Sequence, residues 1–105
     1  MNANLPLSEQ FRIIAKAWVD ADAAANILED TKSAVLAERM LALGDMPVSR
    51  AEMQVKASKE WKDWVNAICE ARQKANKLKV QLEYIRMRSS ELSSFEATKR
   101  AEMKL

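Results

Sequence analysis

The sequence predicts an all-α fold, in which two long helices form an antiparallel, coiled-coil-like hairpin that dimerises into a helical bundle. The 105 residues include one Gly and two Pro, whereas compact folds with many turns need more residues that interrupt helices. Charged residues make up 30% of the chain and apolar residues 49%, many of them Ala. This composition is typical of a few long helices.

A heptad pattern is the third observation. Apolar or small residues recur at alternating steps of four and three over about five heptads, which is typical of a long helix that packs against another helix. We call these positions the seam: Ala57, Trp61, Trp64, Ile68, Ala71, Ala75, Leu78, Leu82, Ile85, Ser89 and Leu92. Because Ser89 is the one polar residue among them, we expect the helix to bury this face.

The first helix is expected over residues 8–43, after a flexible lead-in at residues 1–7. Ser8 is a suitable N-cap, and Glu9 places a carboxylate in the first turn, where the helix dipole favours negative charge. Neither Pro nor Gly interrupts this range, so we expect one helix. Residues 8–105 are accordingly assigned to a single helical-hairpin domain.

The turn is expected at residues 44–49. Gly44 is suited to the left-handed conformation that ends many helices, and Pro47 cannot continue a helix. Neither Gly nor Pro follows, so the second helix is expected over residues 50–104. A connection this short between long helices gives an antiparallel hairpin.

Local signals also mark the start of the second helix. Ser49 and Glu52 have the spacing of a capping box, in which each side chain bonds the other residue's free backbone N–H. Val48 and Met53 have the spacing of a hydrophobic staple. Together these signals predict that the helix begins at Arg50.

The register of the hairpin follows from the position of its turn. Counting outward places Phe11 opposite Leu82, and it places the acidic residues Asp20 and Asp22 opposite Arg72 and Lys74. Residues 86–105 then have no facing segment, and two helices leave one side of each apolar face open. We therefore expect a homodimer or higher homo-oligomer. The residues expected to form the helix seam and to support self-association are Trp61, Trp64, Ile68, Leu78, Leu82, Ile85 and Leu92.

The residue types present give little support to an enzymatic function. The chain has no His, and Cys69 is its single cysteine, so neither the usual zinc ligand sets nor the usual nucleophile–base pairs can form. The carboxylates are scattered along exposed helix positions, and we expect no cleft of ligand-site size in a hairpin. The sequence therefore predicts no catalytic residues, no metal or cofactor site and no small-molecule substrate.

A basic cluster in the second helix has two interpretations. Residues 1–50 hold five Lys/Arg and seven Asp/Glu, whereas residues 51–105 hold twelve and eight. The cations with an interposed aromatic residue are Arg72, Lys74, Lys77, Lys79, Tyr84, Arg86 and Arg88. In one interpretation, such cations flank a pair of helices and determine how the helices pair. In the other, they contact the phosphates of a nucleic acid while the tyrosine stacks on a base. Both alternatives stay open.

The C-terminal segment departs from the heptad pattern. Glu96 and Lys99 occupy positions where the seam requires apolar residues, which leaves Phe95 and Met103 as candidate contacts with a partner. Two alternatives remain for this segment: a frayed tail, or a helix that becomes ordered on a partner.

The chain is expected to be soluble and cytoplasmic. It has no run of about 18 apolar residues that could span a membrane, and residues 1–6 lack the basic and apolar regions of a secretion signal. A single cysteine excludes an intramolecular disulfide, which suits a reducing compartment.

The segment from Lys56 to Leu105 resembles small helical proteins of temperate tailed phages and prophages, which are encoded among early and recombination genes. The likeness rests on the runs AICEARQKAN at residues 67–76, VQLEYIRMR at 80–88 and EATKRAEMKL at 96–105. It covers about half of the chain and includes no catalytic motif, so no site residue is carried over. The resemblance implies the cytoplasm of a bacterial host.

These observations predict a non-enzymatic, phage-encoded interaction protein. We expect it to self-associate and to bind another protein, such as a host defence or replication factor. The alternative function is a DNA-binding accessory of recombination or replication that acts through the basic helix face.

Overall fold

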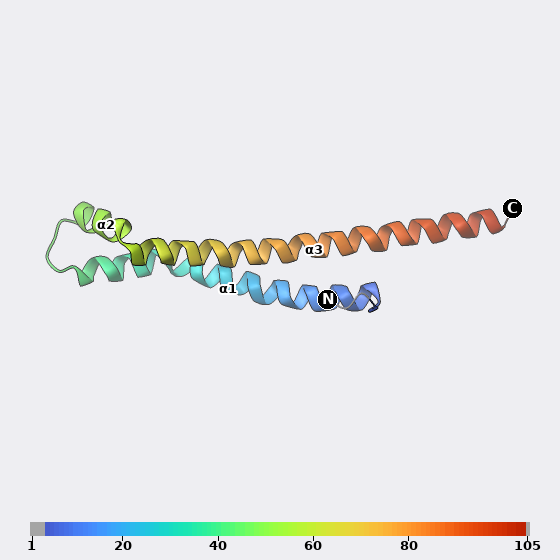
Figure 1. Ribbon diagram of the computed structural model, residues 1–105, viewed down its shortest axis with the longest axis horizontal. Helices are drawn as coiled ribbons and strands as arrows, with labels where there is room; N and C mark the ends of the chain where they lie inside the picture. Colours follow the sequence, from blue (N-terminus) through green and yellow to red (C-terminus); the bar gives the residue numbers. More distant parts are fainter. Residues whose placement is uncertain (1–3, 105) are drawn as a thin grey trace. The chain divides into compact units, whose positions relative to one another are not determined.

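The computed structural model describes residues 4–104 and confirms the all-α fold class (Figure 1). Helix α1 spans Leu7–Ala42, α2 spans Val48–Ala57 and α3 spans Lys59–Met103, and no strand occurs within this described range. Part of the expected lead-in, at residues 1–3, lies outside the described residues. The expected helical hairpin is present, but its second arm consists of two helices.

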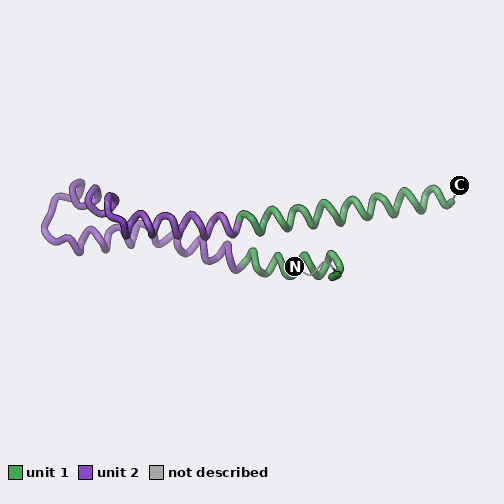
Figure 2. The backbone as a smooth tube through the Cα atoms, viewed as in Figure 1, with its two compact units in different colours: residues 1–19, 76–105 green, residues 20–75 purple. Residues whose placement is uncertain are grey.

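The chain divides into two compact units (Figure 2). The first unit comprises Met1–Val19 and Asn76–Leu105, and the second comprises Asp20–Ala75. Each unit pairs a segment of α1 with a segment of α3, and the second unit also contains the turn and α2.

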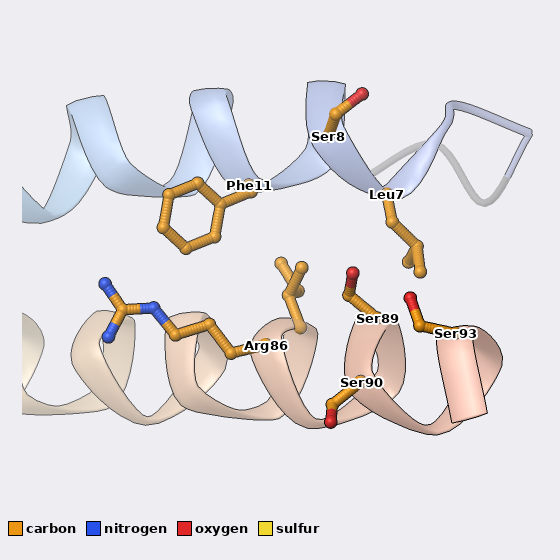
Figure 3. A pocket seen from close by; sticks show the side chains of 8 residues that line it. Leu7, Ser8, Phe11, Arg86, Ser89, Ser90 and Ser93 are labelled. Atoms are coloured by element: carbon orange, nitrogen blue, oxygen red, sulfur yellow. The ribbon is translucent and has the colours of Figure 1, made fainter.

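The core of the first unit lies between the start of α1 and the middle of α3. Ile14, Leu82 and Ile85 are buried in it. Partly buried apolar side chains pack around this cluster: Leu7, Phe11, Ala15, Trp18 and Leu78. The paired segments run antiparallel, since the residues of α1 that come later in the chain lie beside residues of α3 that come earlier (Figure 3).

The core of the second unit combines large and small side chains. Ala25 of α1 and Ala75 of α3 are fully buried, and side chains of this size let two helices approach closely. The remaining buried apolar residues of this unit are Ala51, Val55, Trp61 and Ile68.

Helix α1 ends as the sequence predicts. Gly44 has a φ of +87°, the left-handed conformation that glycine adopts without a steric penalty. Its amide donates a hydrogen bond to the carbonyl of Leu41, and the amide of Leu43 donates one to the carbonyl of Met40. These bonds satisfy carbonyl groups in the last turn of the helix.

The start of α2 differs from the expected capping box. The helix begins at Val48, with Pro47 as its N-cap and without any side-chain capping hydrogen bond. Glu52 bonds Lys56 one turn later, at 2.7 Å between Oε1 and Nζ. The expected staple also fails to form, because Val48 is 71% exposed and Met53 is 73% exposed. The carbonyl of Pro47 accepts the amide of Ala51, and the fixed φ of proline suits a helix start.

The expectation of one continuous helix over residues 50–104 is wrong at Ser58. This residue adopts an extended conformation (φ −72°, ψ 151°) between α2 and α3. Its hydroxyl donates to the carbonyl of Val55 at 2.6 Å and accepts the amide of Trp61 at 3.2 Å. Ser58 therefore ends α2 and caps the start of α3, the role that we assigned to Ser49.

The register agrees in part with the expected one. Arg72 bonds Asp22, as expected, at 2.7 Å. Phe11 packs on the cluster that contains Leu82, but its ring also lies under the guanidinium of Arg86, one helical turn further along α3.

Candidate interaction surfaces

Most of the expected seam residues pack within the chain. In the second unit, Trp61 and Ile68 are buried and Trp64 is half-buried. In the first unit, Leu82 and Ile85 are buried and Leu78 is half-buried. Leu92 is 43% exposed, because it lies beyond the packed part of α3. The structure thus uses the seam from Trp61 to Ile85 for packing inside each unit.

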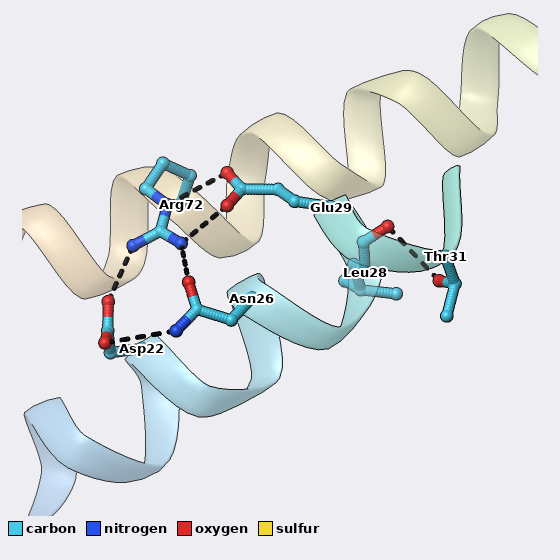
Figure 4. A network of polar contacts seen from close by, with 6 residues as sticks. All are labelled: Asp22, Asn26, Leu28, Glu29, Thr31 and Arg72. Carbon is cyan, nitrogen blue, oxygen red and sulfur yellow. Dashed lines mark hydrogen bonds and ion pairs between the residues drawn. The ribbon is translucent and has the colours of Figure 1, made fainter. Parts of the chain in front are cut away.

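Arg72 is the centre of a polar network in the second unit (Figure 4). Its guanidinium donates two hydrogen bonds to the Glu29 carboxylate, at 3.0 and 2.7 Å. It also donates to the Asp22 carboxylate at 2.7 Å and to the Asn26 amide oxygen at 2.6 Å. The paired bonds to Glu29 use the planar fork of arginine, which lysine lacks. Arg72 is therefore engaged inside the chain and is not a free phosphate contact.

The same network changes the pKa of its ionisable groups. The hydrogen bond from Arg72 lowers the pKa of Glu29 below its usual value of 4.5, whereas desolvation and the charge of Asp22 act in the opposite direction. The hydrogen bonds to Glu29 and Asp22 raise the pKa of Arg72. Both shifts favour the charged forms, so the ion pair persists at neutral pH.

Arg86 also has a partner within the chain. Its guanidinium carbon lies 5.4 Å from the centroid of the Phe11 ring, in the range of a cation–π contact. A surface pocket of about 440 Å³ adjoins this contact in the first unit. The Ser89 and Ser93 hydroxyls point toward α1, and Leu7 extends toward Ser93 (Figure 3). Five α3 positions line the pocket: Ile85, Arg86, Ser89, Ser90 and Ser93.

The other members of the basic cluster are exposed. Lys77, Tyr84 and Arg88 fall on one side of α3 in the first unit, and Tyr84 is 61% exposed. Lys79 lies on a different side of the helix, and Lys74 is exposed in the second unit. The structure therefore divides the cluster, because Arg72 and Arg86 contact side chains of α1, whereas Lys74, Lys77 and Lys79 are exposed.

Tyr84 and Arg88 also line a second pocket of the first unit, of about 770 Å³. Gln10 lines it too, and its amide nitrogen donates to the carbonyl of Leu5 at 2.7 Å. The expectation that the hairpin has no hollow of ligand-site size is therefore wrong for this unit, since ligand sites span about 300–1,000 Å³. The hollow arises where the chain before α1 packs against the middle of α3.

The end of α3 is exposed, although Arg86 contacts Phe11 and three serines, Ser89, Ser90 and Ser93, line the pocket beside α1. Every described residue from Arg86 to Lys104 is exposed, although the helix continues to Met103. Phe95 is 67% exposed and Met103 is 78% exposed. We call residues 86–104 the α3 extension. The two expected partner-contact residues both lie in it, and neither is covered by another part of the described chain.

Sequence reasoning missed several residues that the structure uses. Asn26 and Glu29 join Asp22 in binding Arg72, and their spacing of four and three residues along one helix face could have indicated this. Ser58 was missed because no Pro or Gly accompanies it. A phase change in the apolar pattern marks the break, since Ala51 and Val55 lie about 100° around a continuous helix from Trp61.

None of the helices within residues 4–104 has the length and apolar character of a membrane span. No group of three or more His, Cys, Asp or Glu side chains in the same range is arranged to hold a metal ion. Cys69 is a free, exposed thiol.

Comparison of the chain with protein-family models, with curated proteins and with solved structures found no match. The resemblance of residues 56–105 to phage proteins therefore stays a prediction.

Proposed function

We propose that this chain is a non-enzymatic interaction protein that binds a helical segment of a protein partner along the α3 extension. The observation that carries the proposal is the exposure of every described residue from Arg86 to Lys104 on a helix that continues to Met103. Helices in proteins derive most of their stability from packing of an apolar face. A partner helix would supply this packing.

The apolar side chains of the α3 extension support a protein partner. Met87 is 61% exposed and Phe95 is 67% exposed, and both are residue types that interfaces favour. Phe95 is the largest of the exposed apolar groups there, so we assign it the role of anchor. Self-association and binding of a different protein are both compatible with this surface.

Site-specific photo-cross-linking in living cells tests the proposal. A photoreactive phenylalanine analogue at Phe95 should give a covalent adduct, identified by mass spectrometry, with a second copy of the chain or with another protein. The same analogue at Ala97, on the opposite side of the helix, is the matched control. The proposal is wrong if position 95 gives no more adduct than position 97.

A second candidate function, DNA binding, is favoured by the exposed side of α3 that carries Lys77, Tyr84 and Arg88. Two cations flank an aromatic ring that could stack on a base. In this case, binding to labelled DNA should occur at low salt and decrease steeply as salt rises. Charge reversal at Lys77 and Arg88, the two cations of this side, should abolish it while leaving the helix content unchanged. No binding at low salt would exclude this candidate.

A further inference from the structure

The α3 extension has an inverted charge pattern centred on Phe95. Arg88 and Glu102 lie seven residues to either side of it, and Glu91 and Lys99 lie four residues to either side. Each of these two pairs combines opposite charges. Met87 and Met103, eight residues to either side, add a symmetric pair of apolar residues.

Phe95 and the four charged residues share one face of the helix, whereas Met87 and Met103 lie about 80° to either side of it. At 3.6 residues per turn, the four charged side chains all lie within about 40° of Phe95 around the axis. All of them are exposed, and within residues 4–104 none of the four forms an ion pair. The face therefore presents unpaired charges of both signs around one exposed aromatic ring.

Building on the proposed function, we propose that the occupant of this face is a second copy of the chain, which packs antiparallel with a two-fold axis at Phe95. This symmetry places Arg88 level with Glu102 of the second copy, and Glu91 level with Lys99 of the second copy. Each pairing occurs twice, once on either side of the axis. The two Phe95 rings meet at the centre of the contact.

Charge selects this direction of pairing over the alternative. In a parallel, in-register pair each charged residue would face its own copy, so that Arg88 meets Arg88 and Glu102 meets Glu102. Like charges directly opposed across an interface are unfavourable, and they suppress the wrong arrangement. Exposed ion pairs themselves add little affinity, so Phe95 at the centre of the face supplies most of the attraction.

Sedimentation equilibrium over a range of concentrations tests the dimer. The wild-type chain should approach twice the monomer mass at high micromolar concentration. Arg88→Glu creates a Glu–Glu contact in the antiparallel pair and should weaken the dimer about tenfold or more. Adding Glu102→Arg to it should restore the dimer, because the pair regains opposite charges. In a parallel pair, Glu102→Arg would not restore the dimer, because residues 88 and 102 would each still face a like charge.

Ala97→Glu, on the opposite side of α3, is the control and should leave the dimer unchanged. Far-UV circular dichroism should show the same helix content in all variants, which separates loss of pairing from loss of structure. A wild-type chain that stays monomeric, or a double variant as weak as Arg88→Glu, overturns the inference.

Disulfide trapping tests the direction independently. In a Cys69→Ser background, Arg88→Cys and Glu102→Cys chains are mixed and oxidised. The antiparallel pair should give mostly the mixed disulfide, because residues 88 and 102 face each other. A predominance of the two homodimeric disulfides would overturn the proposed direction.

The two proposals fail in different ways. A monomeric chain that still cross-links another protein from Phe95 in cells would overturn the dimer and leave the proposed function standing. A chain with neither property would overturn both.

Discussion

At the scale of single residues, Arg72 joins α1 and α3 of the second unit through contacts with Asp22, Asn26 and Glu29. The carboxylates of Asp22 and Glu29 lie near one another, and the positive charge of the guanidinium offsets their mutual repulsion. The contacts among partly exposed groups act mainly by fixing the register of the helix pair, since ion pairs in this setting contribute little to stability.

The Glu29 pKa leads to a prediction for pH. A carboxyl group whose pKa is lower in the folded state stabilises the fold above its unfolded pKa, and this contribution is lost as the pH falls through the folded value. The melting temperature of the wild-type chain should therefore decrease below about pH 4.5. Glu29→Gln should melt lower at neutral pH and show a smaller decrease in acid, as followed by circular dichroism.

Glu38→Gln, at another exposed carboxylate of α1, is the matched control and should behave as the wild type does. A Glu29→Gln chain whose melting curve follows that of the wild type at every pH would contradict the role assigned to this ion pair.

Burial along the seam leads to a second prediction. Leu82 is 7% exposed and belongs to the core of the first unit, so Leu82→Ala should cost about 2–5 kcal/mol of unfolding free energy. Leu78→Ala should cost less, because this side chain is half-buried. Leu92→Ala at low protein concentration should have the smallest effect. Urea denaturation measures all three, and equal losses would contradict this order of burial.

At the scale of the elements, periodicity and chain-breaking residues predict most of the fold. The seam predicts the buried side of α3 from Trp61 to Ile85, and Gly44 predicts the end of α1. The break at Ser58 escapes such reasoning, because a serine interrupts a helix only when its hydroxyl competes for a backbone carbonyl. The sequence motif at Ser49 and Glu52 resembles a cap, but Pro47 already defines the start of α2.

The candidate site was predictable to a smaller extent. Sequence reasoning identified Phe95 and Met103 as exposed apolar residues of the C-terminal segment, since the heptad pattern stops before them. It grouped Arg86 with the other cations, because one-dimensional spacing does not show that this side chain meets α1, whereas counting outward from the turn already placed Arg72 opposite acidic residues of α1. The partners of these two arginines come from contacts distant in sequence.

Capping of α3 leads to a prediction that separates the two serines. Ser58→Ala removes the hydroxyl that accepts the Trp61 amide, so it should cost about 1 kcal/mol of unfolding free energy. Ser49→Ala should change stability by less than about 0.5 kcal/mol, because Ser49 is exposed and α2 has no side-chain cap. Urea denaturation of both variants measures the two losses of unfolding free energy. A larger loss for Ser49→Ala would support the capping box at Ser49 and Glu52.

At the scale of the whole molecule, both long helices pass from one unit into the other, whereas the α3 extension belongs to the first unit alone. Packed segments should resist hydrogen exchange most strongly, since their amides open only with the surrounding core. The extension lacks such a core in a single chain.

Hydrogen–deuterium exchange should therefore show two behaviours. Peptides from residues 61–85 should be protected at every protein concentration, whereas peptides from residues 90–103 should exchange quickly in dilute solution and slow down as the concentration rises. Protection of residues 90–103 that is strong and independent of concentration would show that a single chain stabilises this segment.

The extended residue at position 58 also bears on how the chain can change in length. One residue inserted within α3 would rotate every later side chain by about 100°, which would turn Leu82 and Ile85 away from their core. An insertion at the joint between α2 and α3, or in the loop at residues 43–47, can be accommodated by non-helical backbone before the phase of α3 is set. Insertions and deletions should thus be tolerated at these two joints, while the interior of α3 accepts substitutions alone.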